Sequence, residues 1–302
     1  MLRQRGIGVA RLTPRRGLVL LMALVAWLAD WPVSSGLAAS TSESLKSLHS
    51  LPSPNIFSLP DPDDRSLPDT PSPAVISRLL LPDLRTLPPS DLAIDTLPDG
   101  SRELRLSNTI WNSGAGALEL EGEFSPETRK TRVVQHVQAQ TGTQLDHLVG
   151  EFVWHPGHDH WHFAGFSIYE LWTLTPAGKL DAVASSSGKL SYCVIDTDNI
   201  DRQKKGIPSR RRYYGCGQAL QGLSAGWGDT YKSFLDGQSI HLAAVEDGFY
   251  ALKSTVNPDA MLLEANYDNN AALLYLDIRG EHVELITAEE ITERRCQENG
   301  WC

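Results

Sequence analysis

The chain has 302 residues and a formal net charge of −10, with 41% hydrophobic and 21% charged residues. This composition is that of an ordinary globular protein, and it excludes collagen-like, coiled-coil and wholly disordered chains. The acidic balance disfavours nucleic-acid binding and favours encounter with cationic, lysine-rich partners.

Residues 1–39 have the organisation of an export signal. Five Arg residues precede an apolar run from Gly17 to Ala29, and Ala38 and Ala39 supply a cleavage site. The run is shorter than the ~20 residues that span a bilayer, so a membrane contact would come only from an uncleaved signal. Cleavage would leave a net charge of −14, because five Arg and one Asp depart. We expect a secreted, periplasmic or cell-envelope protein.

Residues 40–80 are rich in Ser, Pro, Asp and Leu and contain seven prolines. Proline at this density prevents a regular helix or a central strand, so this segment is predicted to be an extended linker.

Residues 81–280 show a β pattern of short alternating runs separated by Gly, Pro, Asn and Asp. The sequence therefore predicts a mainly β domain, a β-sandwich core with long functional loops. Ala184–Asp236 lacks a clear period and is expected to be one such loop. The tail, 281–302, is expected to hold a short helix near Ala288–Arg295. The predicted strands are Glu103–Trp111, Ala117–Gly122, Phe163–Leu174, Ser239–Ala244, Phe249–Val256 and Ala271–Ile278.

The chain has four cysteines, Cys193, Cys216, Cys296 and Cys302. An even number in an exported protein indicates disulfides, and four cysteines allow three connectivities. The local choice pairs Cys193 with Cys216 and Cys296 with Cys302; buried free thiols are the alternative.

Four of the nine histidines lie within eight residues, in the segment W-H-P-G-H-D-H-W-H from Trp154 to His162. His158, His160 and His162 alternate, so an extended chain projects them to one face. Imidazole is a favoured ligand of copper, zinc and iron. A straight strand would spread the three over roughly 13 Å, so the backbone must bend if all three bind one ion. Copper and zinc both suit this donor set.

The segment resembles the copper-binding motif W-H-x-C-H-x-H-x-H of the lysyl oxidase family, with Gly157 where animal members usually have Cys. Further segments match in the same order along the chain, over about residues 82–280. G-K-L-S-Y-C ends at Cys193 and is similar to G-H-K-A-S-F-C, and Q-G-L-S-A-G-W-G-D-T-Y ends at Tyr231 and is similar to Q-G-L-S-P-G-C-Y-D-T-Y. V-N-P begins at Val256, and E-A-N-Y-D-N-N from Glu264 resembles E-S-D-Y-x-N-N.

The resemblance implies a copper-dependent amine oxidase with the family's β domain. His158, His160 and His162 would bind copper, and His155 would be a non-ligating neighbour. Lys189 and Tyr231 would form the cofactor lysine tyrosylquinone. The expected reaction converts peptidyl-lysine or another primary amine, with molecular oxygen, to an aldehyde, hydrogen peroxide and ammonia. The catalytic base is not identified, and Asp229 is one candidate.

The resemblance also implies a calcium site, for which oxygen ligands are suited. Asn266 replaces an Asp of the family, which removes one charge; a turn stabilised by Asx side chains is the alternative. The expected ligands are Asp83, the Leu84 carbonyl, Glu264, Asn266, Asn269 and Asn270.

Other functions compete with the amine oxidase. A copper-binding envelope protein that keeps the fold and forms no quinone is the first. A zinc hydrolase is the second, and it requires an acid such as Asp159 beside the zinc-bound water. Gly222–Gly226 also fits the G-x-S-x-G pattern of serine hydrolases, but the strand and helix that must flank Ser224 are not visible.

Overall fold

The computed structural model describes residues 78–204 and 206–299, all within one compact unit of the chain. The export signal, the linker as far as residue 77 and Cys302 lie outside the described residues. The elements are β1 (Leu84–Thr86), β2 (Ser90–Thr96), β3 (Arg102–Asn112), β4 (Leu118–Ser125), β5 (Lys130–Gln138), β6 (Gln144–His155), β7 (His160–Leu174), β8 (Leu180–Tyr192), β9 (Asp198–Asn199), β10 (Leu220–Leu223), β11 (Trp227–Tyr231), β12 (Ser239–His241), β13 (Gly248–Val256), β14 (Ala271–Arg279), β15 (His282–Ile286) and helix α2 (Ala288–Asn299).

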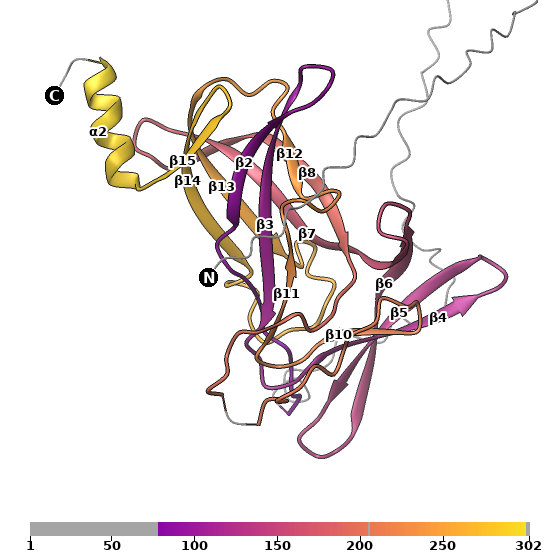
Figure 1. Ribbon diagram of the computed structural model, residues 1–302. Coiled ribbons are helices and arrows are strands. Elements are labelled where there is room, and N and C mark those ends of the chain that lie inside the picture. The colour runs from indigo at the N-terminus through magenta and orange to yellow at the C-terminus, as the bar shows by residue number, and fades with distance from the viewer. Residues whose placement is uncertain (1–77, 205, 300–302) are drawn as a thin grey trace, which may run out of the picture. The chain divides into compact units, whose positions relative to one another are not determined.

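The strands form two antiparallel sheets, so the predicted mainly β fold is confirmed. One sheet has nine strands in the order β10-β4-β5-β6-β7-β13-β14-β15, with β8 also paired to β7. The other has six strands around the long β3, which pairs with β1, β2, β11 and β12, while β9 joins β11. Figure 1 shows β4 and β5 at one end of the larger sheet and β14 and β15 at the other.

All six predicted strands are present, whereas the expectation of a loop throughout Ala184–Asp236 is wrong. Strand β8 continues to Tyr192, and β9, β10 and β11 also lie in this stretch. The polar sequence hides β8 because most of it is exposed or half-buried, and because its register against β7 shifts four times. Alternation is lost at each shift, since a one-residue slip exchanges the two faces of a strand.

Two large hydrophobic clusters and a smaller one beside α2 form the core of the described residues. The first surrounds the histidine segment and includes Phe163, Phe166, Tyr192 and Tyr231. The second lies between β3 and β12 and the strands β7, β13 and β14, with Leu104, Tyr169, Leu171, Ile240 and Leu252 among its members. The histidine segment thus lies at the edge of a packed core, which restricts how its side chains can move.

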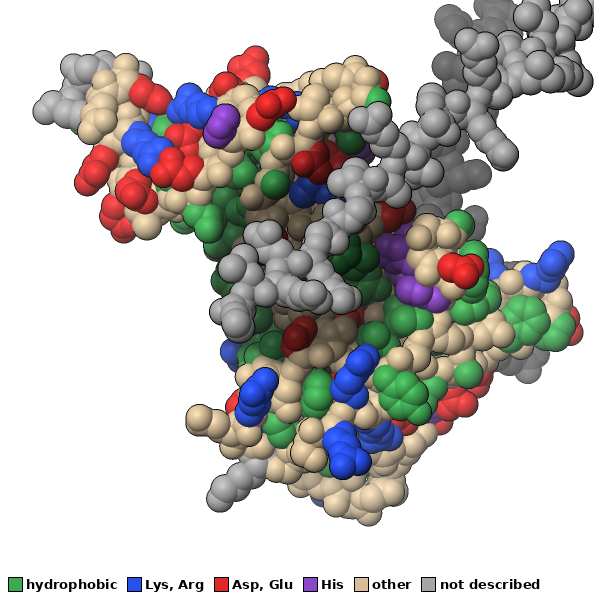
Figure 2. Space-filling view, viewed as in Figure 1, with side chains coloured by type: hydrophobic (Ala, Val, Ile, Leu, Met, Phe, Trp, Pro, Cys, Tyr) green, Lys and Arg blue, Asp and Glu red, His purple; other side chains and the backbone are tan. Residues whose placement is uncertain are grey.

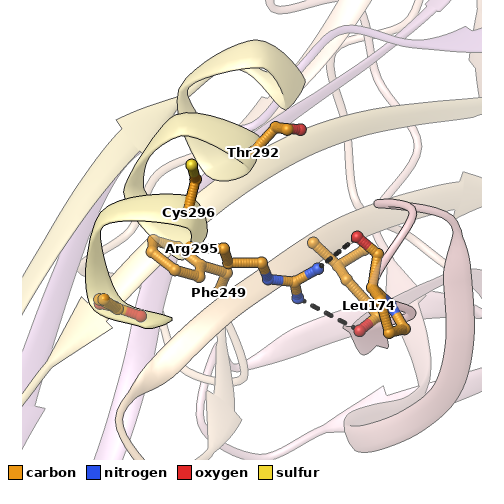
Figure 3. Close-up of a pocket in the computed structure, with 7 residues that line it drawn as sticks. Leu174, Phe249, Thr292, Arg295 and Cys296 are labelled. Carbon is orange, nitrogen blue, oxygen red and sulfur yellow. Dashed lines mark hydrogen bonds between the residues drawn. The ribbon is translucent and has the colours of Figure 1, made fainter. Parts of the chain in front are cut away.

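Helix α2 begins where the sequence predicts a helix. Thr287 caps it, since its Oγ1 accepts a hydrogen bond from the Glu290 N–H while Glu290 Oε2 accepts one from the Thr287 N–H. Figure 3 shows Arg295 directed from α2 to the end of β7, where it donates to the Leu174 carbonyl at 3.2 Å. It also donates to the Thr175 carbonyl at 2.6 Å. Within the described residues, no helix has the length and hydrophobicity that crossing a membrane requires.

Candidate metal and quinone site

The clustered histidines belong to the hairpin of β6 and β7. Its last pair sets His155 opposite His160. Opposed residues of an antiparallel pair lie on one face, so His155, His160 and His162 share a face. In the connecting turn, the His155 carbonyl accepts hydrogen bonds from the N–H groups of His158 and Asp159 at 3.2 and 2.9 Å. The turn provides the bend that the sequence requires, because it brings His158 Nδ1 to 3.2 Å from His162 Nε2.

The imidazole rings form one compact group. Ring centroids lie 4.3 Å apart for His155 and His158, 4.6 Å for His155 and His162, and 4.9 Å for His160 and His162. The ligand atoms of His155, His158 and His162 all lie within 4.8 Å of one another, while His160 lies closest to the sulfurs of Cys193 and Cys216. The structure thus places His155 beside two of the expected ligands, and the third, His160, on the other side of the group.

Three ring nitrogens in this group are buried without a hydrogen-bond partner, His155 Nδ1, His158 Nε2 and His160 Nε2. A buried polar atom without a partner is costly, and a bound metal ion would remove that cost. The donor set therefore fits a metal ion of the copper or zinc class.

The surroundings favour the neutral form of His158, His160 and His162, which is the form that binds metal. Burial lowers the pKa of His158 and of His160. For His162, burial and the three neighbouring histidines lower the pKa to about 3. His162 Nδ1 lies 3.0 Å from the Ser191 carbonyl oxygen, so it carries the proton and leaves Nε2 free toward the group.

Tyr231 lies against the histidines from β11. Its buried hydroxyl accepts a hydrogen bond from the Cys193 N–H at 2.8 Å and lies 3.5 Å from His162 Nε2. Its ring packs on Tyr192 with a centroid distance of 4.1 Å. Burial and the nearby Asp229 raise the pKa of Tyr231. Its phenol is thus held in place beside the group where a metal would bind.

Lys189 reaches the same place from β8. Lys189, Tyr231, His155, His158 and His162 line one cavity of about 180 Å³. The lysine side chain is half exposed, and its amine pairs with Asp259 Oδ2 at 2.6 Å. The two expected cofactor precursors therefore share a cavity, while the amine is bound to an acid outside it.

A second cavity of about 390 Å³ lies on the side of His160 and also contacts His158 and Tyr231. Its wall includes the disulfide Cys193–Cys216, which confirms the local pairing predicted for these two cysteines. The second predicted pair includes Cys302, which lies outside the described residues. Figure 2 shows histidine side chains grouped beside a hollow lined by hydrophobic side chains.

The expected calcium ligands also come together, with one exception. Glu264 is buried and accepts hydrogen bonds from the Leu84 N–H, Asn257 and Asn270, and burial raises its pKa. Asp83 Oδ1 accepts a hydrogen bond from Asn269, and the side-chain oxygens of Asn269 and Asn270 are buried without partners. Asn266 is exposed and caps a turn through the Asp268 N–H.

The serine-hydrolase pattern has a structural role instead. Ser224 is buried, and its Oγ donates a hydrogen bond to Asp196 Oδ2 at 2.8 Å. Asp196 also accepts hydrogen bonds from the N–H groups of Arg212 and Tyr213. The hydroxyl therefore ties three segments together, and strand β11 follows it where a hydrolase would have a helix.

Sequence reasoning missed three contributors to the site. The place of His155 could have been found, because a Pro-Gly turn between alternating runs predicts a hairpin that pairs His155 with His160. Asp259 and Asp236 carried no local signal. Asp236 lines the smaller cavity, and a Cβ at Gly157 would lie 2.6 Å from its Oδ2.

Comparison with known proteins supplies the context for this arrangement. The lysyl oxidase family model matches residues 127–288, more than half of the chain. Protein-lysine 6-oxidase from Gallus gallus is 34% identical over 130 residues, which are 43% of this chain and 28% of that protein. The enzyme of the same name from Sus scrofa is 32% identical over 130 residues, 48% of its length, and lysyl oxidase homolog 1 from Homo sapiens is 33% identical over 132 residues, 21% of its length.

The matches thus span less than half the length of these relatives. The region that the family model matches includes the histidine hairpin, since β6 and β7 fall within residues 127–288. The chain belongs to the lysyl oxidase family.

Proposed function

We propose that this chain is an exported amine oxidase that depends on copper and on a lysine tyrosylquinone formed from Lys189 and Tyr231. It converts peptidyl-lysine or another primary amine to an aldehyde and releases hydrogen peroxide and ammonia. One observation carries the proposal: Lys189 and Tyr231 line a single cavity together with three histidines.

His158 and His162 would hold the metal, with His160 as the third ligand that the family resemblance implies. The neutral ring of His162 and the unpartnered Nε2 atoms of His158 and His160 support this assignment. His155 is close enough to act as a further ligand or to hold the other rings by stacking. Copper would supply the redox chemistry with molecular oxygen that turns a phenol into a quinone.

The quinone would supply an electrophilic carbonyl for a primary amine and a two-electron acceptor. The residues of this chain prepare the two precursors differently. The Cys193 N–H holds the Tyr231 hydroxyl, and Ser191 fixes the His162 ring beside it. Asp259 holds the Lys189 amine at the surface, so the lysine must leave this ion pair before it can join the ring.

Calcium bound by Asp83, Glu264, Asn269 and Asn270 is a further part of the proposal. The two unpartnered amide oxygens and the buried Glu264 carboxyl support a cation there. Such an ion would tie the start of β1 to the loop before β14, and we expect calcium to raise the melting temperature.

The substrate is expected to be a lysine-rich protein or a small primary amine. The acidic balance of the chain favours encounter with cationic partners, and the disulfide and the export signal support a location outside the cytoplasm. Trp154 and Phe234 are exposed near this site in the sequence, as expected for a surface that meets another protein.

A copper-loaded preparation would test the proposal by metal analysis, a quinone stain and peptide mass mapping. We expect a crosslink between the peptides that hold Lys189 and Tyr231, and its absence from the Lys189→Arg and Tyr231→Phe variants. Bound copper with two unmodified peptides after aerobic incubation would instead support the non-catalytic copper-binding protein. Bound zinc without a crosslink would reject both.

A further inference from the structure

We propose that the larger cavity receives the substrate amine and that Asp229 in its wall is the base that removes the proton from the substrate carbon. This inference rests on the proposed amine oxidase function. It assigns a substrate position and a catalytic residue that the family match does not provide.

Asp229 is a buried acid without partners. It is 1% exposed, and neither of its carboxylate oxygens has a hydrogen-bond partner. Burying a carboxylate without hydrogen bonds lowers the stability of the folded state, so stability alone does not explain an acid at this position. Such groups are concentrated at sites of proton transfer.

The neighbouring acids are different, because donors satisfy both of them. Asp196 accepts hydrogen bonds from Ser224 and from two backbone N–H groups, and Asp198 accepts them from the Thr197 and Thr230 hydroxyls. Asp229 differs from both, because neither of its oxygens makes a hydrogen bond of normal geometry and only the Ile195 N–H lies close enough to act on the carboxylate.

The position of Asp229 suits this role. It lies two residues before Tyr231 on β11, so both side chains leave the same face of the strand, and both residues line the larger cavity. The charge on Asp229 already acts on the Tyr231 ring, whose pKa it raises. The residue is therefore next to the ring on which the cofactor would form.

The rest of the cavity wall suits an aliphatic amine. Its volume of about 390 Å³ falls within the range of small-molecule sites. Ile195, Leu235 and the Cys193–Cys216 disulfide provide apolar contacts, and Thr197 and Thr230 add hydroxyls. An unbranched methylene chain, as in a lysine side chain, would pack on these walls with its reactive end toward Asp229 and Tyr231.

The proton step balances as follows. The bond between hydrogen and the carbon next to the substrate nitrogen breaks, and the proton goes to a carboxylate oxygen of Asp229. The bound quinone would accept the electron pair of that bond. Over the whole reaction, one water supplies the oxygen of the aldehyde, the substrate nitrogen leaves as ammonia, and dioxygen takes up two electrons and two protons to become hydrogen peroxide. Asp229 returns its proton to solvent before the next cycle.

The charged and titratable groups around Asp229 determine how it responds to pH. Burial raises its pKa well above the usual range of a carboxyl. Asp198 and Asp196 raise it further, whereas the Ile195 N–H and Arg211 lower it. Tyr192, Tyr231, His158 and His160 complete the surroundings. A raised pKa makes the carboxylate a stronger base once it is deprotonated.

The test uses the copper-loaded full chain with pentylamine, and with the same amine deuterated at the carbon next to nitrogen. We expect Asp229→Asn to retain copper and the Lys189–Tyr231 crosslink while kcat falls about 10²- to 10⁴-fold. The residual rate should show a large deuterium effect and lose the pH dependence of the base. Asp181→Asn is the control, since it removes an exposed carboxylate of β8 that lines neither cavity, and it should retain normal turnover.

A second variant protects the test against a folding defect. Asp229→Ala leaves space for a small acid, so added formate should restore part of its turnover and have no effect on the wild type. Normal turnover in a crosslinked Asp229→Asn enzyme would overturn the role of Asp229 alone. Absence of the crosslink in the wild type would overturn the proposed function, and the assignment of Asp229 with it.

Discussion

Two cavities meet at His158 and Tyr231, and they differ in what lines them. The cavity of about 180 Å³ is polar, with Lys189, Ser191 and Gln238 beside the histidines. The cavity of about 390 Å³ has a disulfide, Leu235 and the unpartnered Asp229. The smaller contains the residues that would build the cofactor, and the larger has the space and the free carboxylate for a substrate. Tyr231 lines both cavities, so the cofactor could form on its ring from the smaller cavity and meet the substrate from the larger one.

The largest expected effects come from variants of the two cofactor precursors that line the smaller cavity. Tyr231→Phe removes the oxygen through which the ring must be oxidised, and Lys189→Arg removes the primary amine that must join it. Both variants are expected to lose the quinone stain and all oxidase activity. Tyr231→Phe also leaves the buried Cys193 N–H without its acceptor, so it should lower the unfolding free energy by about 1–3 kcal/mol, whereas the exposed Lys189→Arg should change it little. A quinone signal in either variant would show that other residues form the cofactor.

The next effect concerns the histidines between the cavities. His162→Gln and His158→Gln should each lower copper affinity about 100-fold or more, measured by chelator competition. His160→Gln should lower it more than His155→Gln, and the nitrogen splitting in the electron paramagnetic resonance spectrum of bound copper should change in the same order. A larger loss of copper affinity in His155→Gln than in His160→Gln would mean that the third ligand is His155, which lines the smaller cavity.

Loss of the disulfide should damage the larger cavity. Cys193→Ser with Cys216→Ser opens a loop of 23 residues and is expected to cost about 2–4 kcal/mol of unfolding free energy. The Cys193 N–H also fixes the Tyr231 hydroxyl, so cofactor formation should slow as well. Chemical denaturation and the quinone stain measure the two effects. Unchanged stability would mean that the wall holds its shape without the crosslink.

The stability of the folded chain is expected to depend on pH through Asp229, which lines the larger cavity. Its pKa is raised in the folded chain, so the folded state binds this proton more tightly than the unfolded state. Its contribution to stability is therefore present below the ordinary carboxyl pKa and is lost as pH rises through the folded value. Asparagine does not titrate, so the Asp229→Asn variant should not lose stability in this way as pH rises. Without copper, the variant should match the wild type near pH 4 and exceed it by about 1–3 kcal/mol at high pH. Thermal unfolding across pH checks this, and an equal difference at every pH would contradict it.

The smallest expected effect concerns Asp259, the acid that holds the Lys189 amine. Both side chains of this ion pair are exposed, so it is worth less than about 1 kcal/mol. Asp259→Asn should leave the melting temperature unchanged and speed quinone formation no more than about fivefold, since the free amine reaches the ring more often. Stopped aerobic incubations with the quinone stain would follow this rate. Slower formation would mean that Asp259 guides the amine toward Tyr231.

The sequence predicted local features of this molecule well and distant ones poorly. Alternation alone indicated six strands and the shared face of His160 and His162. It missed β8, where bulges interrupt the alternation, and it gave His155 only the place of a non-ligating neighbour of the other histidines. Asp259 lies 70 residues from Lys189, and no local pattern joins them. The lack of hydrogen bonds to the Asp229 carboxylate could not be predicted either, because the nearby donors bond to Asp196 and Asp198 only in the folded structure.

The turn of the histidine hairpin depends on no covalent link. Gly157 stands where animal relatives usually have Cys, and the Asp236 carboxylate occupies the space that a side chain there would need. Backbone hydrogen bonds from His158 and Asp159 hold the turn instead. Thiol reductants should therefore leave the turn itself intact while they open the wall at Cys216, whose carbonyl accepts a hydrogen bond from the Trp161 N–H of β7. Reduction of the disulfide is expected to reach the histidines through β7 and not through the turn.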